Sequence, residues 1–195
     1  AALADYQEKL NTVYDNPETI YANSCGFCHG LDGSGNGEEA KYLLIPPEKI
    51  NSVRTTQAYL YEKLKNGVDG TGMPYFTYYL DNELEDLMEY LNLKFKIIEK
   101  PEPARKVSEE AITAAAKHYS ETCSSCHGAD GKGNTKLGRG LTPPPPDFTH
   151  YSLTPERTFE VITNGYNGTM MVSFKKLPEE VRWGLVNIIQ EKRVD

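Results

Sequence analysis

The sequence predicts an all-α protein made of two tandem domains with the same fold, and three observations support this. A short pattern of two cysteines followed by a histidine occurs twice, and its copies lie 98 positions apart (123 − 25). The residues around the copies match in one register without gaps, which indicates an internal duplication. Apolar residues near the end of each half recur at helical spacing, as in Leu84, Leu87, Met88 and Leu91.

The repeated pattern is Cys25-Gly26-Phe27-Cys28-His29 in the first half and Cys123-Ser124-Ser125-Cys126-His127 in the second. C-x-x-C-H is the attachment signal for haem c. Two thiols on one helical turn can each add to a vinyl group of the same porphyrin, and the next residue places its imidazole under the iron. The sequence therefore predicts two haem c groups, with thioethers from Cys25, Cys28, Cys123 and Cys126 and with His29 and His127 as iron ligands.

Other uses of paired cysteines fit less well. Two C-x-x-C pairs that share a zinc ion usually lie about 15–20 residues apart, far closer than these. A thioredoxin-like redox pair requires a strand–helix–strand setting, which surrounds neither copy. Structural disulfides form in oxidising compartments, but they leave the histidine after each pair unexplained.

The register divides the chain into a first domain over residues 1–93, a linker over 94–106 and a second domain over 107–195. Residues 1–15 are interpreted as an N-terminal extension that forms an extra helix on the first domain. Two prolines and mixed charges predict an extended linker, with Ile97 and Ile98 packed on a domain surface.

The positions that match between the two halves include Tyr21 with Tyr119, Gly30–Asn36 with Gly128–Asn134, Pro46-Pro47 with Pro144-Pro145, Asn66-Gly67 with Asn164-Gly165, Gly70-Thr71 with Gly168-Thr169, Met73 with Met171 and Phe76 with Phe174.

The same helices are expected in both halves. Asn16 and Ser108 are predicted to cap the helices that lead into the two motifs, with Pro17 at the first helical position of one of them. A glycine-rich loop and a proline turn follow each histidine, and a carbonyl of each proline turn is expected to accept the free N–H of the histidine ring. Two amphipathic helices are then expected over 56–65 and 155–163, and two closing helices over 82–93 and 178–192.

The second ligand of the first haem is predicted to be a methionine, because residues 1–98 contain no histidine besides His29. Met88 lies in the apolar stripe of the closing helix, where core packing is expected. Met73 lies in Gly70-Thr71-Gly72-Met73-Pro74, whose glycines let the backbone approach a flat cofactor. Met73 is therefore the expected ligand.

In the second half, Met170 and Met171 are adjacent, and both the register and the Gly-Thr-x-Met pattern select Met171. His118 precedes the cysteines on the motif helix and is poorly placed to reach the iron, which leaves His150 as the alternative ligand. His/Met ligation raises the reduction potential relative to two histidines and fills both axial positions. This favours an electron carrier over an enzyme that binds substrate at the iron.

The formal net charge of −7 is unevenly distributed. Residues 1–98 carry 8 Lys+Arg and 15 Asp+Glu, whereas residues 99–195 carry 13 of each. The negative charge of the first half is expected to steer encounters with partner proteins. It argues against nucleic acid as a binding partner. No apolar run approaches the ~18 residues of a transmembrane helix, so no transmembrane segment is expected.

Together, the C-x-x-C-H-Gly motifs, the Asp-Gly-x-Gly loops, the proline turns and the Gly-Thr-x-Met loops resemble class I cytochrome c. Two tandem copies are similar to the dihaem cytochromes of the c-four type, over nearly the whole chain outside residues 1–15 and the linker. The resemblance implies an all-α fold, covalent haems ligated by His29 with Met73 and by His127 with Met171, and electron passage across a shared domain interface. Such proteins deliver electrons to terminal oxidases or reductases.

The sequence thus predicts a soluble electron carrier between redox partner proteins, with no catalytic role of its own. Covalent haem attachment implies export in bacteria, so a periplasmic location with the signal peptide removed is expected. A cytochrome subunit of a larger dehydrogenase or reductase complex is the first alternative. A dihaem enzyme with an open haem is the second.

Overall fold

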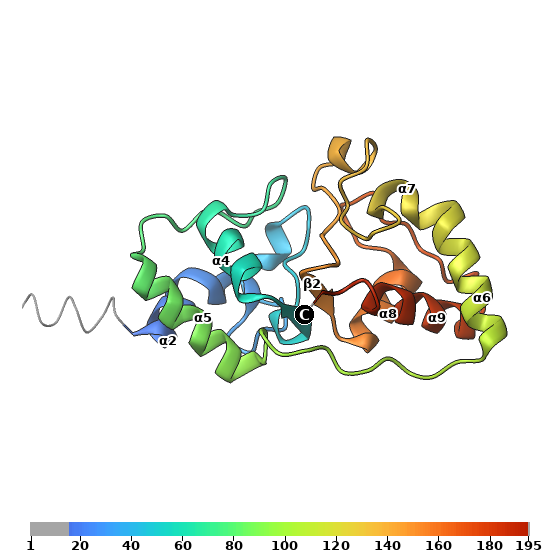
Figure 1. Cartoon of the computed structure of the whole chain (residues 1–195). Helices are drawn as coiled ribbons and strands as arrows, with labels where there is room; N and C mark the ends of the chain where they lie inside the picture. The colour runs from blue at the N-terminus through green and yellow to red at the C-terminus, as the bar shows by residue number, and fades with distance from the viewer. Residues whose placement is uncertain (1–15, 195) are drawn as a thin grey trace, which may run out of the picture.

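The computed structural model describes residues 16–194 and has two helical lobes joined by an extended linker (Figure 1). The all-α, two-domain prediction is confirmed, while the helix expected within residues 1–15 lies outside the described residues. The N-terminal half comprises α2 (Pro17–Ile20), a π-helical turn (Tyr21–Cys25), α3 (Gly26–His29), β1 (Val53–Thr55), α4 (Gln57–Asn66) and α5 (Asp81–Phe95). The C-terminal half comprises α6 (Glu109–His118), a π-helical turn (Tyr119–Cys123), α7 (Ser124–His127), β2 (Tyr151–Leu153), α8 (Pro155–Asn164) and α9 (Glu179–Gln190).

The predicted helix starts are confirmed at the level of hydrogen bonds. The side chain of Asn16 accepts from the backbone N–H of Glu18 at 2.9 Å, and the hydroxyl of Ser108 accepts from that of Ala111 at 3.2 Å. Such caps satisfy N–H groups that have no partner inside the helix. In both halves a π-helical turn then carries the chain without a break into the helix that bears the second cysteine and the histidine.

Each half has its own apolar core. In the N-terminal half, Tyr21 and the closing-helix residues Leu84 and Leu87 are fully buried. Ile97, expected to pack on a domain surface, is buried in this core, and Ile98 packs against it partly buried. In the C-terminal half the core is smaller and forms where α6 packs on α9, around Leu185 and Val186. Within residues 16–194, no helix has the length and apolar character needed to cross a membrane.

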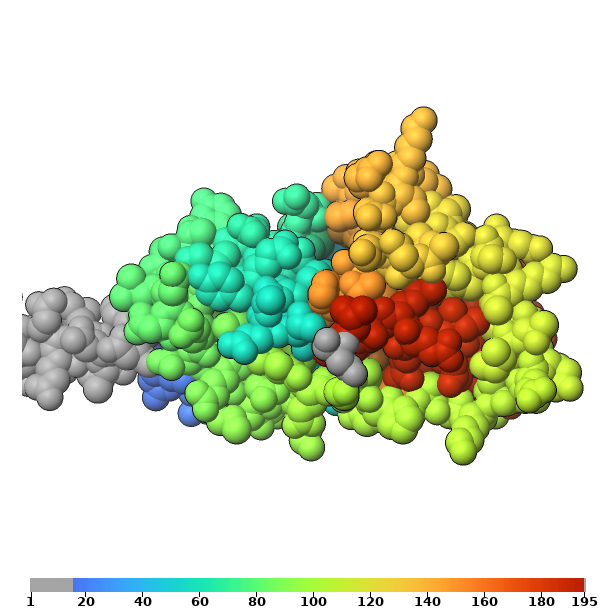
Figure 2. All heavy atoms as spheres, in the orientation of Figure 1, coloured from blue at the N-terminus to red at the C-terminus, as the bar shows by residue number. Residues whose placement is uncertain are grey.

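A two-stranded antiparallel sheet joins the halves and was not expected from the sequence. Strands β1 and β2 pair so that Arg54 faces Ser152 at the centre, and these two residues are separated by the repeat spacing (152 − 54 = 98). The flanking hydrogen bonds are also related by the repeat: Thr56 N–H donates to the carbonyl of His150 at 3.0 Å, and Thr154 N–H to that of Ser52 at 2.8 Å. The halves are therefore related by an approximate two-fold axis through the sheet, and Figure 2 shows them in direct contact there.

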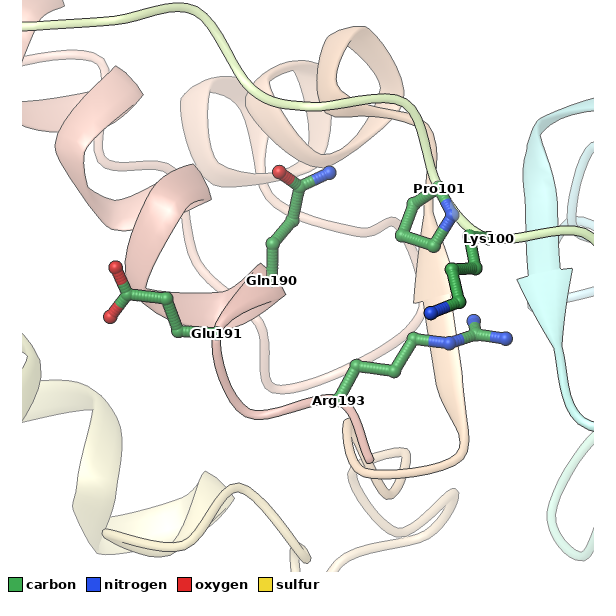
Figure 3. A pocket seen from close by; sticks show the side chains of 5 residues that line it. All are labelled: Lys100, Pro101, Gln190, Glu191 and Arg193. Carbon is green, nitrogen blue, oxygen red and sulfur yellow. The ribbon is translucent and has the colours of Figure 1, made fainter. Parts of the chain in front are cut away.

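The linker lies along the C-terminal half after α5, which runs on to Phe95, and it forms no regular helix or strand before α6. Gln190 fastens it, because its side-chain amide donates to the carbonyl of Glu102 at 2.9 Å and accepts from the N–H of Ala104 at 2.9 Å. An open hollow beside this contact is lined by Lys100, Pro101, Gln190, Glu191 and Arg193 (Figure 3). No cysteine, histidine or methionine lines it, so it is a feature of the linker junction.

Helices α6 and α9 approach so closely that a side chain larger than hydrogen does not fit at Gly184. A Cβ atom there would lie 2.8 Å from the Cβ of Ala115 and 3.0 Å from the carbonyl oxygen of Ala111. We expect Gly184→Ala to lower the free energy of unfolding by about 1–2 kcal/mol, because overpacking outweighs the gain in helix propensity. Denaturant unfolding of the haem-loaded protein measures this.

Gly140→Ala is the matched control, since nothing lies within 4 Å of a Cβ at that exposed position. Its free energy of unfolding should change by no more than about 0.5 kcal/mol. Equal effects of the two substitutions would contradict the close helix approach at Gly184.

Candidate haem-binding sites

The two C-x-x-C-H motifs place a pair of thiols and an imidazole on one continuous helical stretch in each half. All four cysteines carry free, half-buried thiols. Burial raises the pKa of Cys25 to about 12 and that of Cys123 to about 11, so both are protonated thiols at neutral pH. Across residues 16–194, no three His, Cys, Asp or Glu side chains converge in a way that could hold a metal ion.

A buried tyrosine holds the chain just after each histidine. The backbone turns there at Gly30 (φ 73°) and Gly128 (φ 79°), a left-handed conformation that favours glycine. The hydroxyl of Tyr21 donates to the carbonyl of Gly30 at 2.6 Å, and that of Tyr119 donates to the carbonyl of Gly128 at 2.8 Å. These bonds tie the end of the motif helix to its beginning, and the two tyrosines are equivalent in the repeat. The sequence register paired them but assigned them no role.

His29 is held in the orientation that an iron ligand requires. Its Nδ1–H donates to the carbonyl of Glu48 at 3.1 Å, which leaves the Nε2 lone pair available for a metal. Burial lowers the pKa of His29, so the ring is neutral near pH 7. The expected carbonyl acceptor is therefore present, and it belongs to the residue directly after the Pro46-Pro47 turn.

The equivalent bond expected for His127 is absent from the described part of the chain. Nδ1 of His127 is buried and has no hydrogen-bond partner there, and its ring instead stacks on Phe148 with 4.7 Å between ring centres and 16° between planes. Burial alone lowers the pKa of His127 to about 4, so this ring is also neutral.

The methionine loops of the two halves have the same hydrogen bonds. The hydroxyl of Thr71 accepts from the N–H of Met73 at 3.1 Å, and that of Thr169 accepts from the N–H of Met171 at 3.1 Å. Met73 is half-buried against the N-terminal core, and Met171 is half-buried as well. Met170 is 71% exposed to solvent.

The remaining candidates occupy other settings. Met88 is buried in the core of the N-terminal half, as expected. The ring of His118 packs edge-on against Phe174, with 5.4 Å between ring centres. His150 is exposed, and its backbone carbonyl takes part in the contact between the halves.

The donor set fits one haem c in each half. Each half offers two free thiols on one helical stretch, a neutral half-buried imidazole and a half-buried thioether on a separate loop. Haem attachment through C-x-x-C-H uses the thiols and the imidazole, and a thioether suits the second axial position of a cytochrome c. Two tandem units of this kind define a c-type cytochrome with two domains.

A protein-family model described as "Cytochrome C oxidase, cbb3-type, subunit III" matches residues 12–91 and again residues 110–188. The chain belongs to this family, whose cytochrome c domains carry covalently bound haem c, and its two domains account for two haems. It is an electron-transfer cytochrome.

Among solved structures, a chain of the reducing HAO-like protein complex from Kuenenia stuttgartiensis matches at 24% sequence identity and a TM-score of 0.44. The match covers 93% of this chain and 97% of that one. Among curated proteins, no relative matches significantly.

The tyrosine hydroxyls should contribute measurably to stability. We expect Tyr21→Phe and Tyr119→Phe each to lower the free energy of unfolding by about 0.5–1.5 kcal/mol, because each removes a buried hydrogen bond to a glycine carbonyl. That carbonyl keeps one donor, the N–H of Gly33 or of Gly131. Denaturant unfolding of the haem-loaded protein measures the change. Tyr78→Phe is the control, since Tyr78 is exposed, and a loss equal to that of the buried pair would contradict the assignment.

Proposed function

We propose that the protein is a periplasmic electron carrier in which His29 with Met73 and His127 with Met171 ligate two low-spin haems. Haem c supplies a one-electron iron couple, and the chain's own residues hold it in place. The cysteines tether the group, and the histidine and methionine fill both axial positions. No coordination site then remains for a substrate, which suits electron transfer and not catalysis at the iron.

The observation that carries this proposal is the way in which the ligand loops meet across the interface. A Cβ on Gly70, in the Met73 loop, would lie 2.4 Å from the Thr142 side chain and 3.1 Å from the nitrogen of Pro143. A Cβ on Gly168, in the Met171 loop, would lie 2.5 Å from the carbonyl of Leu44. Each methionine loop thus packs on the other half, and Leu44 and Thr142 are equivalent in the repeat.

This reciprocal packing of the methionine loops supports two haem sites that face one interface. Electron transfer between haems depends on a short, fixed separation, and a paired strand with symmetric loop contacts gives the two halves one defined arrangement. An electron that enters one half can then leave from the other. The fixed arrangement therefore supports a relay in which electrons pass between the two haems. Two haems that acted independently would not need it.

A second candidate is an electron-transfer subunit of a larger oxidase, reductase or dehydrogenase complex. The description of the matching family, which names a subunit of an oxidase, favours this candidate. Three exposed apolar side chains after the Met73 loop, Tyr75, Tyr78 and Leu80, also suit a partner surface. Co-purification of a stoichiometric partner from the native organism would support the subunit, whereas a single free chain would support the carrier.

The methionine assignments can be tested by replacement. We expect Met73→Ala and Met171→Ala each to abolish the methionine–iron charge-transfer band of one ferric haem, to lower its reduction potential and to allow carbon monoxide to bind after reduction. Optical redox titration measures all three effects.

Met170→Ala is the control, because its exposed side chain lies next to Met171, and both haems should keep their spectra and potentials. Loss of the band in Met170→Ala but not in Met171→Ala would reverse the assignment. Rapid binding of carbon monoxide by the unmodified protein would instead indicate an open haem and an enzymatic role.

The charge difference between the halves suggests different docking faces. Exposed cations of the C-terminal half lie after His127 and after Met171, in the two segments that carry its proposed ligands. They are Lys132, Lys136, Arg139, Lys175 and Lys176. The N-terminal half carries the net negative charge. An anionic reagent should therefore exchange electrons mainly with the C-terminal haem.

We expect Lys132→Glu with Lys136→Glu, and Lys175→Glu with Lys176→Glu, each to slow oxidation of the reduced protein by hexacyanoferrate(III) about tenfold or more at low ionic strength. The difference should shrink as salt screens the charges. Stopped-flow absorbance measures the rate. Lys41→Glu with Lys94→Glu, exposed in the N-terminal half, is the charge-matched control, and an equal slowing there would rule out a docking face on the C-terminal half.

A further inference from the structure

The loop that orients His29 is held by the other half of the protein. The carbonyl of Glu48 accepts the Nδ1–H of His29, while the carboxylate of the same residue accepts from Nε of Arg157 at 2.8 Å. Arg157 lies on α8 of the C-terminal half. Both side chains are largely shielded, at 13% exposure for Arg157 and 21% for Glu48. Removing one partner of a shielded, hydrogen-bonded ion pair strongly destabilises the folded protein, because the other charge is left without its partner.

The carboxylate also fixes the direction of the carbonyl. Oε1 of Glu48, the atom that Arg157 binds, accepts the backbone N–H of Lys49 at 2.9 Å. That N–H and the carbonyl of Glu48 belong to one planar peptide unit and point in opposite directions. Holding the N–H toward Arg157 therefore turns the carbonyl toward His29.

Further contacts keep Arg157 and this loop in place. Nη1 of Arg157 pairs with Glu160 at 2.9 Å, and Nζ of Lys49 pairs with the same carboxylate at 3.2 Å. The hydroxyl of Tyr166 donates to the carbonyl of Pro46 at 3.0 Å. The Glu48 ion pair and the hydrogen bonds of Arg157 hold the pKa of Arg157 well above its usual value, despite an opposing effect of burial. The guanidinium is therefore charged at any pH at which the protein is folded.

The repeat supplies an internal comparison. The counterpart of Glu48 is Pro146, which has no carboxylate, and the counterpart of Arg157 is Tyr59, which lies beside the backbone N–H of Asp147 as a neutral phenol. In that half His127 lacks the carbonyl bond.

The two proline loops approach the glycine-rich loops of their own halves in the same way. The carbonyl of Pro47 lies 2.8 Å from a Cβ position on Gly35, and that of Pro145 lies 2.6 Å from one on Gly133. The half with the ion pair has the histidine–carbonyl bond, and the half without the ion pair lacks it.

We propose that Arg157 is a positioning residue for the N-terminal haem: through Glu48 it aims the carbonyl that orients His29, so the C-terminal half adjusts the ligand of the haem in the other half. This inference rests on the proposed ligation by His29. A carbonyl acceptor makes an imidazole a stronger donor to its metal, which stabilises the ferric state. Loss of the anchor should therefore raise the potential of the N-terminal haem alone.

The test is a charge-neutral double variant, Glu48→Ala with Arg157→Met, in the haem-loaded protein. It removes the anchor while leaving the net charge unchanged, so a general electrostatic effect on the potential is cancelled. NMR of the reduced protein should show the Nδ1–H of His29 exchanging with solvent about fivefold faster, as expected for a hydrogen bond contributing about 1 kcal/mol. Redox titration should show a raised potential for the N-terminal haem and an unchanged one for the C-terminal haem.

Two further variants act as controls. Arg157→Lys keeps a charged donor and should restore most of the slow exchange. Lys49→Gln removes one positive charge from the same interface without touching the carboxylate of Glu48, and should leave the His29 exchange rate within about twofold of that in the unmodified protein. Arg157→Met alone provides the exchange measurement if the double variant does not fold.

Unchanged exchange at His29 in the double variant, or an equal change at His127, would overturn the proposal. So would a Lys49→Gln variant that behaves like the double variant. If the unmodified protein shows no haem-shifted ring protons from His29, the proposed ligation itself fails. Haem-shifted His29 protons together with an unresponsive double variant would reject only the role of Arg157.

Discussion

Backbone hydrogen bonds between β1 and β2 join the two halves, and the rest of the arrangement depends on them. Each strand has only three residues, and an isolated two-stranded sheet is marginally stable in water. Side chains reinforce it: Arg193 donates to the carbonyl of Arg54 at 2.7 Å and to the hydroxyl of Ser152 at 2.9 Å, and buried Arg54 pairs with Glu102 at 2.8 Å. Because the central pair occupies equivalent repeat positions, contacts on one side of the axis recur on the other. This symmetry brings both methionine loops to the interface.

The side chains at this interface break the symmetry that the backbone keeps. Glu48 with Arg157 forms a shielded ion pair on one side, while Pro146 with Tyr59 occupies the matching place on the other. In a duplicated chain whose halves pack on each other, side-chain differences at the interface can make the two sites unequal without changing the fold of either half. The acidic N-terminal half and the charge-balanced C-terminal half extend the same difference to the outer surface, where it affects encounter with partners and has little effect on folding.

Local interactions explain why much could be predicted. The cap side chains of Asn16 and Ser108 lie within three residues of the backbone N–H groups that donate to them, so composition and spacing suffice to place them. Covalent attachment of haem c requires the C-x-x-C-H motif, which occupies only five consecutive positions. The register extended these local signals to Met73 and Met171, and their loops do share the same hydrogen bonds, although ligation by these methionines stays a prediction.

The sequence by itself determined the all-α class, the duplication, the two haem c groups and the positions of the main helices. The tertiary structure decided how the halves meet, because strands of only three residues are too short for an apolar–polar pattern to identify them, and their partners lie about 100 residues away. It also decided that Glu48 supplies the acceptor for His29 and that His127 has none among the described residues. That difference depends on the contact between Glu48 and a guanidinium from the other half, and a pairing between distant side chains has no local signature in the chain.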